Sequence, residues 1–307
     1  MSKPKVAITI GDPAGIGPEI VFRAVNSLEV QRVCSPVVFG DKTIIEKYTK
    51  NNKIAAQFVY SSNFNQNIAL GKPSKISGLA ACSAIKEAAQ WCMTGLTQSL
   101  VTAPVSKESF KLAGLKAPGH TEFLAELTNT KNYCMMMICG KINCVMVTRH
   151  LPLNKIAKNL TKKNIISTIK TAEAFLNRYK KNPSITVCSL NPHAGDNGIL
   201  GTEEKEIIMP AVKQLKKEKY NICGPFAPDA VWAVLNEKNY DLIVGMYHDQ
   251  IMIPLKTINA KKIINVTAGL PFVRTSPGHG TAFDIAGKNK ADISSMKEAV
   301  IFAAKRL

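Results

Sequence analysis

The sequence lacks the features that mark membrane proteins and disulfide-stabilised proteins. No stretch approaches the ~18 uninterrupted apolar residues that a membrane helix needs. The opening residues, MSKPKVAITIGDPAG, show no charged segment followed by an apolar one, as a signal peptide would. Eight cysteines in 307 residues do not indicate a disulfide framework, and none forms the closely spaced pairs of a zinc knuckle or redox motif. We therefore expect a cytoplasmic protein that does not associate with a membrane.

Three of the cysteines are regularly spaced, which raises the question of a metal site. Cys134, Cys139 and Cys144 lie in NYCMMMICGKINCVMV, an apolar pattern typical of a hairpin that turns at Gly140. We interpret them as reduced core residues, which fits a reducing compartment.

Arginine is scarce in a chain that is otherwise strongly basic. Lysine and arginine total 40 against 22 acidic residues, a formal net charge of +18, yet only six of the 40 are arginine. The lysines are scattered, and their densest runs lie on or beside amphipathic helices rather than forming one face for phosphate binding. We therefore expect no nucleic-acid partner, although a basic surface attracts small anionic substrates.

Short apolar runs alternate with helical patterns along the whole chain, which predicts parallel strands joined by crossover helices. A chain of this length is long enough for two lobes, and the hairpin at 134–149 interrupts the rhythm where a second lobe would begin. The expected strands are 6–10, 36–40, 99–105, 184–190, 241–247 and 263–269, and the expected helices begin at 18, 77, 120 or 121, 161, 202 and 293.

The five histidines all follow an apolar run or lie beside a glycine-rich turn, where open α/β sheets place their ligands. A single histidine in such a place is more often structural, but all five sharing it favours function. Three imidazoles with open coordination positions are typical of catalytic zinc and its neighbours. His150, His193 and His248 meet that count.

Two glycine-rich stretches are candidates for anion or cofactor binding. GDPAGIGPE (11–19) follows the first strand and opens a helix, so it is either an anion-binding turn or a tight structural one. It does not have the GxGxxG spacing. GHGTAFDIAGK (278–288) is too polar for core and carries Asp284, which makes it either a nucleotide loop or an ordinary connection.

Two basic side chains near these loops suit a carboxylate or phosphate. Arg274 has the planar fork that binds such groups through two hydrogen bonds. Lys256 is either a second such group or simply exposed, and Asn265 lies between them in the sequence.

Together the motifs closely resemble one family over essentially the whole chain. The motifs are GDPAGIGPE, GHTEFLAEL, NPHAGDNG, GPFAPDAVW, YHDQ followed by PLK, and INVTAGLPFVRTS leading into HGTAFDIAGK. In this order they are similar to the 4-hydroxythreonine-4-phosphate dehydrogenases of vitamin B6 biosynthesis.

The resemblance implies an α/β fold like that of isocitrate and isopropylmalate dehydrogenases, with two lobes and an active cleft between them. The lobe with the cofactor loop would comprise 1–128 plus 268–307, and the central lobe 129–267 would carry the metal ligands and the dimer interface. It further implies a homodimer whose metal site borrows a ligand across the interface.

The resemblance also assigns the site residues. His150, His193 and His248 would bind one divalent metal, for which zinc is expected and magnesium or cobalt are alternatives. NAD, with NADP as the alternative, would bind the loop from His279 to Gly287. The assigned sets are substrate residues His120, Thr121, Lys256, Asn265 and Arg274; cofactor residues His279, Gly280, Thr281, Asp284 and Gly287; and catalytic residues Asp229, Lys256 and His193.

The implied reaction is oxidation of the 3-hydroxyl of 4-phosphooxy-L-threonine by NAD, followed by decarboxylation to 3-amino-2-oxopropyl phosphate. A cation at the hydroxyl would favour both steps. Asp229, Asp249 and Asp196 are candidates to orient histidines or move protons, with Asp229 first.

The sequence departs from the usual family pattern at a few positions. Gly278 stands where an acidic residue is common, Asn289 and Lys290 replace a glycine-rich continuation, and Asn197 and Ile251 occupy positions that are often glycine. We expect these departures to affect the affinity or preference for the cofactor rather than the class of reaction. A same-fold dehydrogenase acting on another phosphorylated 3-hydroxy acid is the main alternative; a phosphate acetyltransferase-like or nucleic-acid-binding scaffold is disfavoured by the histidines.

Overall fold

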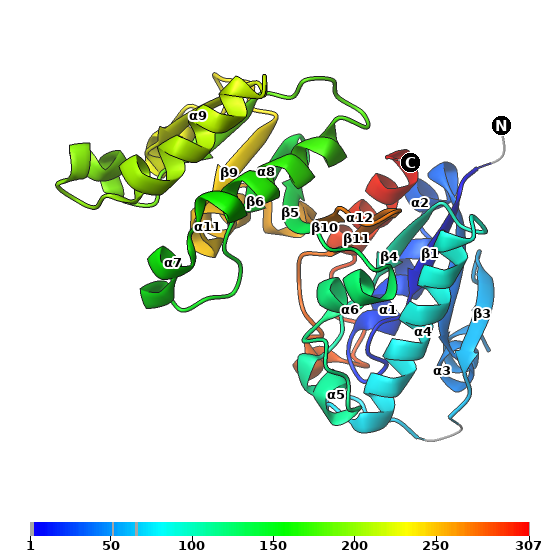
Figure 1. Cartoon of the computed structure of the whole chain (residues 1–307). Coiled ribbons are helices and arrows are strands. Elements are labelled where there is room, and N and C mark those ends of the chain that lie inside the picture. Colours follow the sequence, from blue (N-terminus) through cyan, green and yellow to red (C-terminus); the bar gives the residue numbers. More distant parts are fainter. Residues whose placement is uncertain (1–2, 51, 65–66, 307) are drawn as a thin grey trace. The chain divides into compact units, whose positions relative to one another are not determined.

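The computed structural model describes residues 3–50, 52–64 and 67–306, and the chain divides into two compact units (Figure 1). The first unit comprises Met1–Lys131 and Ile264–Leu307, and the second comprises Asn132–Ile263. Each unit has its own set of mostly parallel strands and its own buried apolar cluster. The predicted α/β class is therefore confirmed.

The strands of the first unit follow the order β3-β2-β1-β4-β11-β10. All neighbours pair in parallel except β10 and β11, which are antiparallel. The continuous apolar runs of the central strands suit a sheet that is covered on both faces. The strands are β1 (Lys5–Thr9), β2 (Ser35–Asp41), β3 (Gln57–Ser62), β4 (Ser99–Thr102), β10 (Ile263–Ala268) and β11 (Val273–Pro277).

Helices cover both faces of this sheet. On one face, α4 (Lys75–Met93), α5 (Lys107–Leu112) and α6 (His120–Leu127) share a buried cluster with Ala7 and Leu100 of the strands. Helix α12 (Ser294–Lys305) packs on β1, β4 and β11, and α1 (Gly17–Val25) and α2 (Leu28–Val33) contact it. Helix α3 (Lys42–Thr49) lies between β2 and β3 in the chain, with Asp41 as its N-cap.

The strands of the second unit follow the order β5-β6-β9-β7-β8. Strands β5 and β6 form the predicted hairpin, which turns at Gly140, where φ is +61°. The pairs β6–β9, β9–β7 and β7–β8 are parallel. The strands are β5 (Cys134–Cys139), β6 (Ile142–Met146), β7 (Ile185–Cys188), β8 (Ile222–Phe226) and β9 (Leu242–Gly245).

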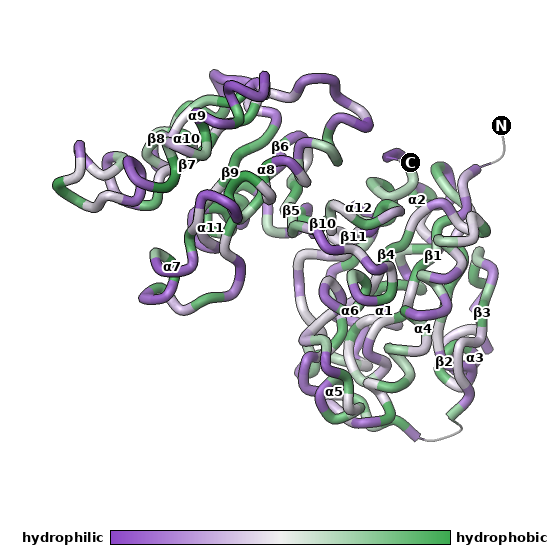
Figure 2. Tube along the Cα trace, in the orientation of Figure 1, coloured by the Kyte–Doolittle hydropathy of each residue, from purple (hydrophilic) through white to green (hydrophobic). Residues whose placement is uncertain are grey.

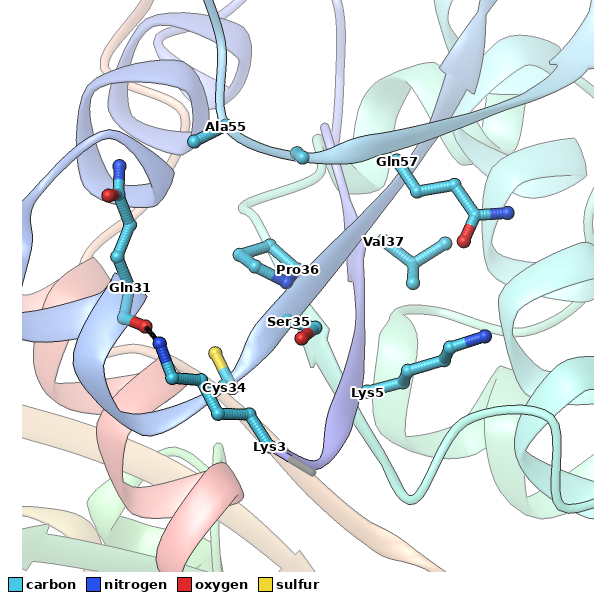
Figure 3. Close-up of a pocket in the computed structure, with 10 residues that line it drawn as sticks. Lys3, Lys5, Gln31, Cys34, Ser35, Pro36, Val37, Ala55 and Gln57 are labelled. Atoms are coloured by element: carbon cyan, nitrogen blue, oxygen red, sulfur yellow. Dashed lines mark hydrogen bonds between the residues drawn. The ribbon is translucent and has the colours of Figure 1, made fainter. Parts of the chain in front are cut away.

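The second unit's buried cluster lies where α10 (Pro228–Ala233) and α11 (His248–Asn259) meet β5, β6, β7 and β9. Helix α8 (Lys162–Leu176) contacts β5 and β6, α9 (Met209–Lys217) contacts β8, and α7 (Leu153–Asn159) precedes α8. Cys139, Cys144 and Cys188 belong to this cluster, and none of the eight cysteines, all of which lie in the described ranges, forms a disulfide. Figure 2 shows β9 as an apolar stretch, whereas the helices alternate between apolar and hydrophilic segments.

Among the residues that the structure describes, no helix combines the length and the apolar character needed to cross a membrane.

We predict that Leu100→Ala destabilises the protein strongly, because Leu100 is fully buried under α4 and α5. Removing a buried leucine side chain should lower the free energy of unfolding by about 2 to 5 kcal/mol. Leu112→Ala is the matched control, since Leu112 is 49% exposed. Urea titration of both variants measures the difference, and equal losses would contradict the assigned core.

Candidate active site

A buried arginine forms the centre of the first unit's polar cluster. Arg274 on β11 is only 1% exposed. Its Nη1 donates to Thr267 Oγ1 at 2.9 Å and its Nη2 donates to Thr102 Oγ1 at 2.6 Å. Burial lowers the pKa of the guanidinium to about 10, against the opposing effect of the Glu122 carboxylate. A cation buried among hydroxyls lacks the full compensation that an anionic ligand would give.

Three of the predicted substrate residues carry buried polar atoms without a hydrogen-bond partner. Eight such side-chain atoms occur among the residues that the structure describes, and they include Arg274 Nε, His120 Nε2 and Asn265 Oδ1. Asn265 and Thr267 lie on the same face of β10, because they are two residues apart. In the antiparallel pairing with β11, Asn265 lies opposite Ser276 and Thr267 lies opposite Arg274. Buried polar groups are normally paired, so these three atoms retain hydrogen-bonding capacity that a polar ligand would use.

His120 is neutral in this environment. It is the first residue of α6, and its ring packs edge-on against Phe110 with ring centroids 6.2 Å apart. Burial, and secondly the positive charge of Arg274, hold the pKa of His120 well below its usual 6.5. A neutral imidazole both donates and accepts hydrogen bonds, so it suits a substrate hydroxyl or amine. Thr121, next in the helix, is 8% exposed.

The loop 11–19 is a structural turn rather than an open set of donors. The backbone amides of Asp12, Gly15 and Ile16 are already bonded to the carbonyls of Pro104, Asp12 and Thr281. A Cβ on Gly15 would lie 2.8 Å from the Thr281 carbonyl oxygen, so glycine permits this close approach. The sequence left two readings open, and these bonds favour the structural one.

Asp12 is fixed by this turn. Its carboxylate accepts from Ala14 N at 3.0 Å and from Ser109 Oγ at 2.6 Å. Burial raises the pKa of Asp12 above its usual value, against these hydrogen bonds. Asp12 thus ties the turn to α5.

The predicted cofactor loop rests on that turn. Thr281 accepts from Ile16, as noted, and the Gly287 amide donates to the carboxylate of Glu19 on α1. Glu19 is 2% exposed, and its Oε2 is another buried atom without a partner. His279 and Asp284 are exposed and therefore accessible to a ligand, and His279 Nδ1 lies 3.1 Å from Gly280 O. Sequence reasoning missed Glu19, although it ends the GIGPE motif.

The second unit brings two of the three predicted metal ligands together. The rings of His150 and His248 have centroids 5.9 Å apart. Both line a cavity of about 350 Å³ together with Arg149, Tyr247 and Asp249. His248 opens α11, and its Nδ1 lies 2.7 Å from Asp249 Oδ1. A carboxylate at one ring nitrogen is the usual device for aiming the other nitrogen at a metal.

The third predicted ligand lies apart from this pair. His193 does not line the cavity, and within the described ranges no three His, Cys, Asp or Glu side chains are grouped closely enough to hold a metal ion. His193 is exposed in the turn Pro192–Gly198 after β7. Gln250 links the two regions: its Nε2 donates to Ser189 O and its Oε1 accepts from Met246 N.

The turn that carries His193 is unusual. Residues 193–197 all have positive φ, between 42° and 81°, and form a left-handed turn. Left-handed helical backbone costs roughly 1 to 2 kcal/mol per residue that has a Cβ. Such strain persists only where the surroundings enforce it, and it concentrates at functional sites.

The remaining predicted residues are accessible. Asp229 is exposed in the first turn of α10, and Lys256 is exposed on α11, two turns beyond His248. Both side chains are therefore accessible for proton transfer or substrate contact. Within this unit, however, neither lines the cavity of His150 and His248.

Comparison with known proteins places this arrangement in a family. Residues 32–303 match the model of the family described as pyridoxal phosphate biosynthetic protein PdxA. The chain belongs to this family. The resemblance inferred from the motifs, and with it the dehydrogenase class, is confirmed.

Individual relatives cover nearly the whole chain. A 4-hydroxythreonine-4-phosphate dehydrogenase from Sulfurihydrogenibium sp. is 39% identical, covering 97% of each chain. A D-threonate 4-phosphate dehydrogenase from Salmonella typhimurium is 38% identical, covering 99% of each. The crystal structure of 4-hydroxythreonine-4-phosphate dehydrogenase from Klebsiella pneumoniae is 34% identical with a TM-score of 0.90, covering 98% of this chain and 100% of that one.

The lowered pKa of His120 predicts a pH dependence of stability. Below the ordinary pKa of 6.5 the unfolded chain binds a proton that the folded protein does not, so stability falls as the pH decreases. The loss should reach about 1.4 kcal/mol per pH unit below 6.5. His120→Gln should remove it, and His279→Gln, which replaces an exposed imidazole, is the control. Urea titrations at pH 7.5 and 5.5 measure it; an unchanged slope in His120→Gln contradicts the assignment.

Proposed function

We propose that this enzyme oxidises the 3-hydroxyl of 4-phosphooxy-L-threonine with NAD, and that loss of carbon dioxide then gives 3-amino-2-oxopropyl phosphate for pyridoxal 5′-phosphate biosynthesis. The observation that carries the proposal is the set of unpartnered buried atoms on Arg274, His120 and Asn265. A substrate with an anionic group, an amine and a hydroxyl supplies the partners that these atoms lack. Eight free thiols fit a cytoplasmic enzyme.

The first unit would bind the substrate's polar groups. Arg274 is held by two threonine hydroxyls while its Nε lacks a partner, so it would bind a carboxylate or phosphate oxygen. Neutral His120 and the Asn265 oxygen would take a hydroxyl and an amine. Because the partners of Arg274 come from β4 and β10, the guanidinium is fixed before substrate arrives, which limits the entropy lost on binding.

The residues present fit a divalent cation. His150 and His248 face one cavity, and Asp249 fixes the tautomer of His248, as in many histidine metal sites. We assign the third ligand to His193 of a second copy of the chain, and zinc as the metal. When bound, the cation would supply the positive charge that lowers the pKa of the substrate hydroxyl and stabilises negative charge left by decarboxylation.

Three exposed large apolar side chains in the second unit support a homodimer. Ile199, next to the His193 turn, is 79% exposed, and Ile253 on α11 is 62% exposed. Leu153, just after His150, is 69% exposed. Each of these side chains is close in the sequence to one of the three histidines, and exposed apolar side chains that gather in one region are typical of a covered interface. The dimer would thus complete the metal site.

The loop from His279 to Gly287 would hold NAD. Its backbone is anchored through Thr281 and Gly287, while Asp284 is free to accept from ribose hydroxyls. Asp229 and Lys256 would exchange protons with the substrate, with Asp229 as the base. Both are exposed and therefore able to reach a bound ligand.

The substrate is tested by turnover of 4-phosphooxy-L-threonine with NAD and zinc, followed as NADH formation. The matched alternative is D-threonate 4-phosphate, because relatives of similar identity carry either name. The two compounds differ in an amine against a hydroxyl at carbon 2. We expect kcat/KM to be at least tenfold higher for the amino acid. A preference for D-threonate 4-phosphate contradicts the proposed substrate while leaving the reaction class intact.

The shared metal site is tested by mixing two inactive variants. His193→Ala and His248→Ala should each lose zinc and turnover when purified alone. Refolded or co-expressed at equal amounts, they should recover about a quarter of wild-type activity, because half of the dimers are mixed and each carries one intact site. His279→Ala, mixed with His248→Ala, is the control. Failure to recover activity contradicts a ligand supplied by the second copy.

A further inference from the structure

The left-handed turn 192–198 holds five consecutive residues in a strained backbone conformation, so its surroundings must enforce it. Backbone hydrogen bonds close its C-terminal end: Ile199 N donates to Asp196 O and Leu200 N donates to Gly195 O, each at 3.1 Å, and Ile199 N also donates to Gly195 O. Most of the turn is exposed, and only Gly195 is buried. Ala194 has a φ of 54°, a conformation that residues with a Cβ rarely adopt.

A buried carboxylate lies directly beneath this turn. Glu204 is 4% exposed and begins the wide helical turn Glu204–Ile208 that leads into α9. Its Oε1 accepts from the backbone amides of Leu190 and Asn191 at 2.7 and 2.8 Å. Its Oε2 accepts from the Asn191 side-chain amide at 3.0 Å. One carboxylate therefore fixes the entry to the turn at three points.

The turn is fitted closely around this carboxylate. A Cβ on Gly195 would lie 2.7 Å from Glu204 Oε2 and 3.0 Å from the Gly201 carbonyl oxygen. Gly195 is thus the residue whose absent side chain lets the backbone rest on Glu204. Burial by itself raises the pKa of Glu204, but the hydrogen bonds from Asn191 and Leu190 lower it below its usual value. The group is therefore an anion that accepts and does not donate.

We propose that Glu204 is the positioning residue that enforces the left-handed turn and so presents His193 to the metal. The inference rests on the proposed function, in which His193 is a ligand. Three imidazoles from two chains can bind one ion only if each is correctly oriented. A histidine on an exposed turn must therefore be held in its binding orientation before the metal arrives. Glu204 supplies that order through the backbone, without touching the metal.

The test compares Glu204→Gln with Glu206→Gln in the full-length protein. Glu206 is exposed in the same helical turn, so the control makes the same chemical change without altering the anchor. The amide of glutamine keeps one acceptor oxygen but places a donor against the Asn191 side chain. Hydrogen exchange of residues 190–200 and zinc titration by calorimetry are measured on both variants.

We expect Glu204→Gln to speed exchange at the amides of Leu190 and Asn191 and to weaken zinc binding at least tenfold, as loss of an outer-sphere partner does. Glu206→Gln should match the wild type in both measurements. Exchange or zinc affinity equal to that of the control would overturn the proposal, as would a change in only one of the two.

Two further variants keep the test decisive. If Glu204→Gln does not fold, Glu204→Asp retains the charge but shortens the reach, and the same two changes are expected. Adding Ala194→Gly to the Glu204 variant should restore part of the zinc affinity, because glycine adopts positive φ without strain. A purely structural role for Glu204 would show no such rescue.

The failure of this proposal is distinguishable from failure of the proposed function. If His193→Ala retains wild-type zinc affinity, His193 is not a ligand and the metal assignment fails. If His193→Ala loses zinc while Glu204→Gln behaves like its control, the metal assignment stands and the positioning role of Glu204 is wrong.

Discussion

The burial of the Arg274 guanidinium is the constraint on which the first unit's site depends. Its two hydrogen bonds go to Thr267 and Thr102, so one cation joins three neighbouring strands on the face covered by α4, α5 and α6. Hydroxyls orient a buried charge but do not neutralise it. The burial of this charge is a cost in the free protein that, under the proposed function, an anionic substrate would offset on binding. Polar atoms of His120 and Asn265 also lack hydrogen-bond partners and would be available to the same ligand.

In the second unit the unfavourable feature is a strained backbone rather than a buried charge. His193 sits in a left-handed turn that few residues tolerate, and the turn persists because the buried carboxylate of Glu204 receives the amides at its entry. The His150 and His248 pair, by contrast, lies at a cavity and uses Asp249 as an orienting group. The proposed metal site would combine the His150 and His248 pair of one chain with His193 of a second copy.

The sequence predicted those strands and turns that local apolar patterns reveal, and those residues that belong to recognisable motifs. The apolar runs around β1, β2 and β9 and the hairpin turning at Gly140 are found close to where they were expected. The antiparallel pairing of β10 with β11 was missed, because register is set by long-range pairing. Glu19 and Glu204 were missed because, in the sequence, each resembles an ordinary acidic residue in the first turn of a helix. Their burial against a glycine-rich turn depends on tertiary packing, which the local sequence does not reveal. Whether Lys256 and Asp229 reach substrate depends on a bound ligand, so those assignments stay predictions.

In the proposed metal site, one ion would be held by His150 and His248 of one chain and His193 of another. Anomalous diffraction at the zinc edge, from crystals grown with zinc, tests this most directly. The account predicts one strong peak per chain within about 2.0 to 2.1 Å of three histidine nitrogens drawn from two chains. A peak bound by residues of a single chain, or no peak at His150 and His248, would contradict it.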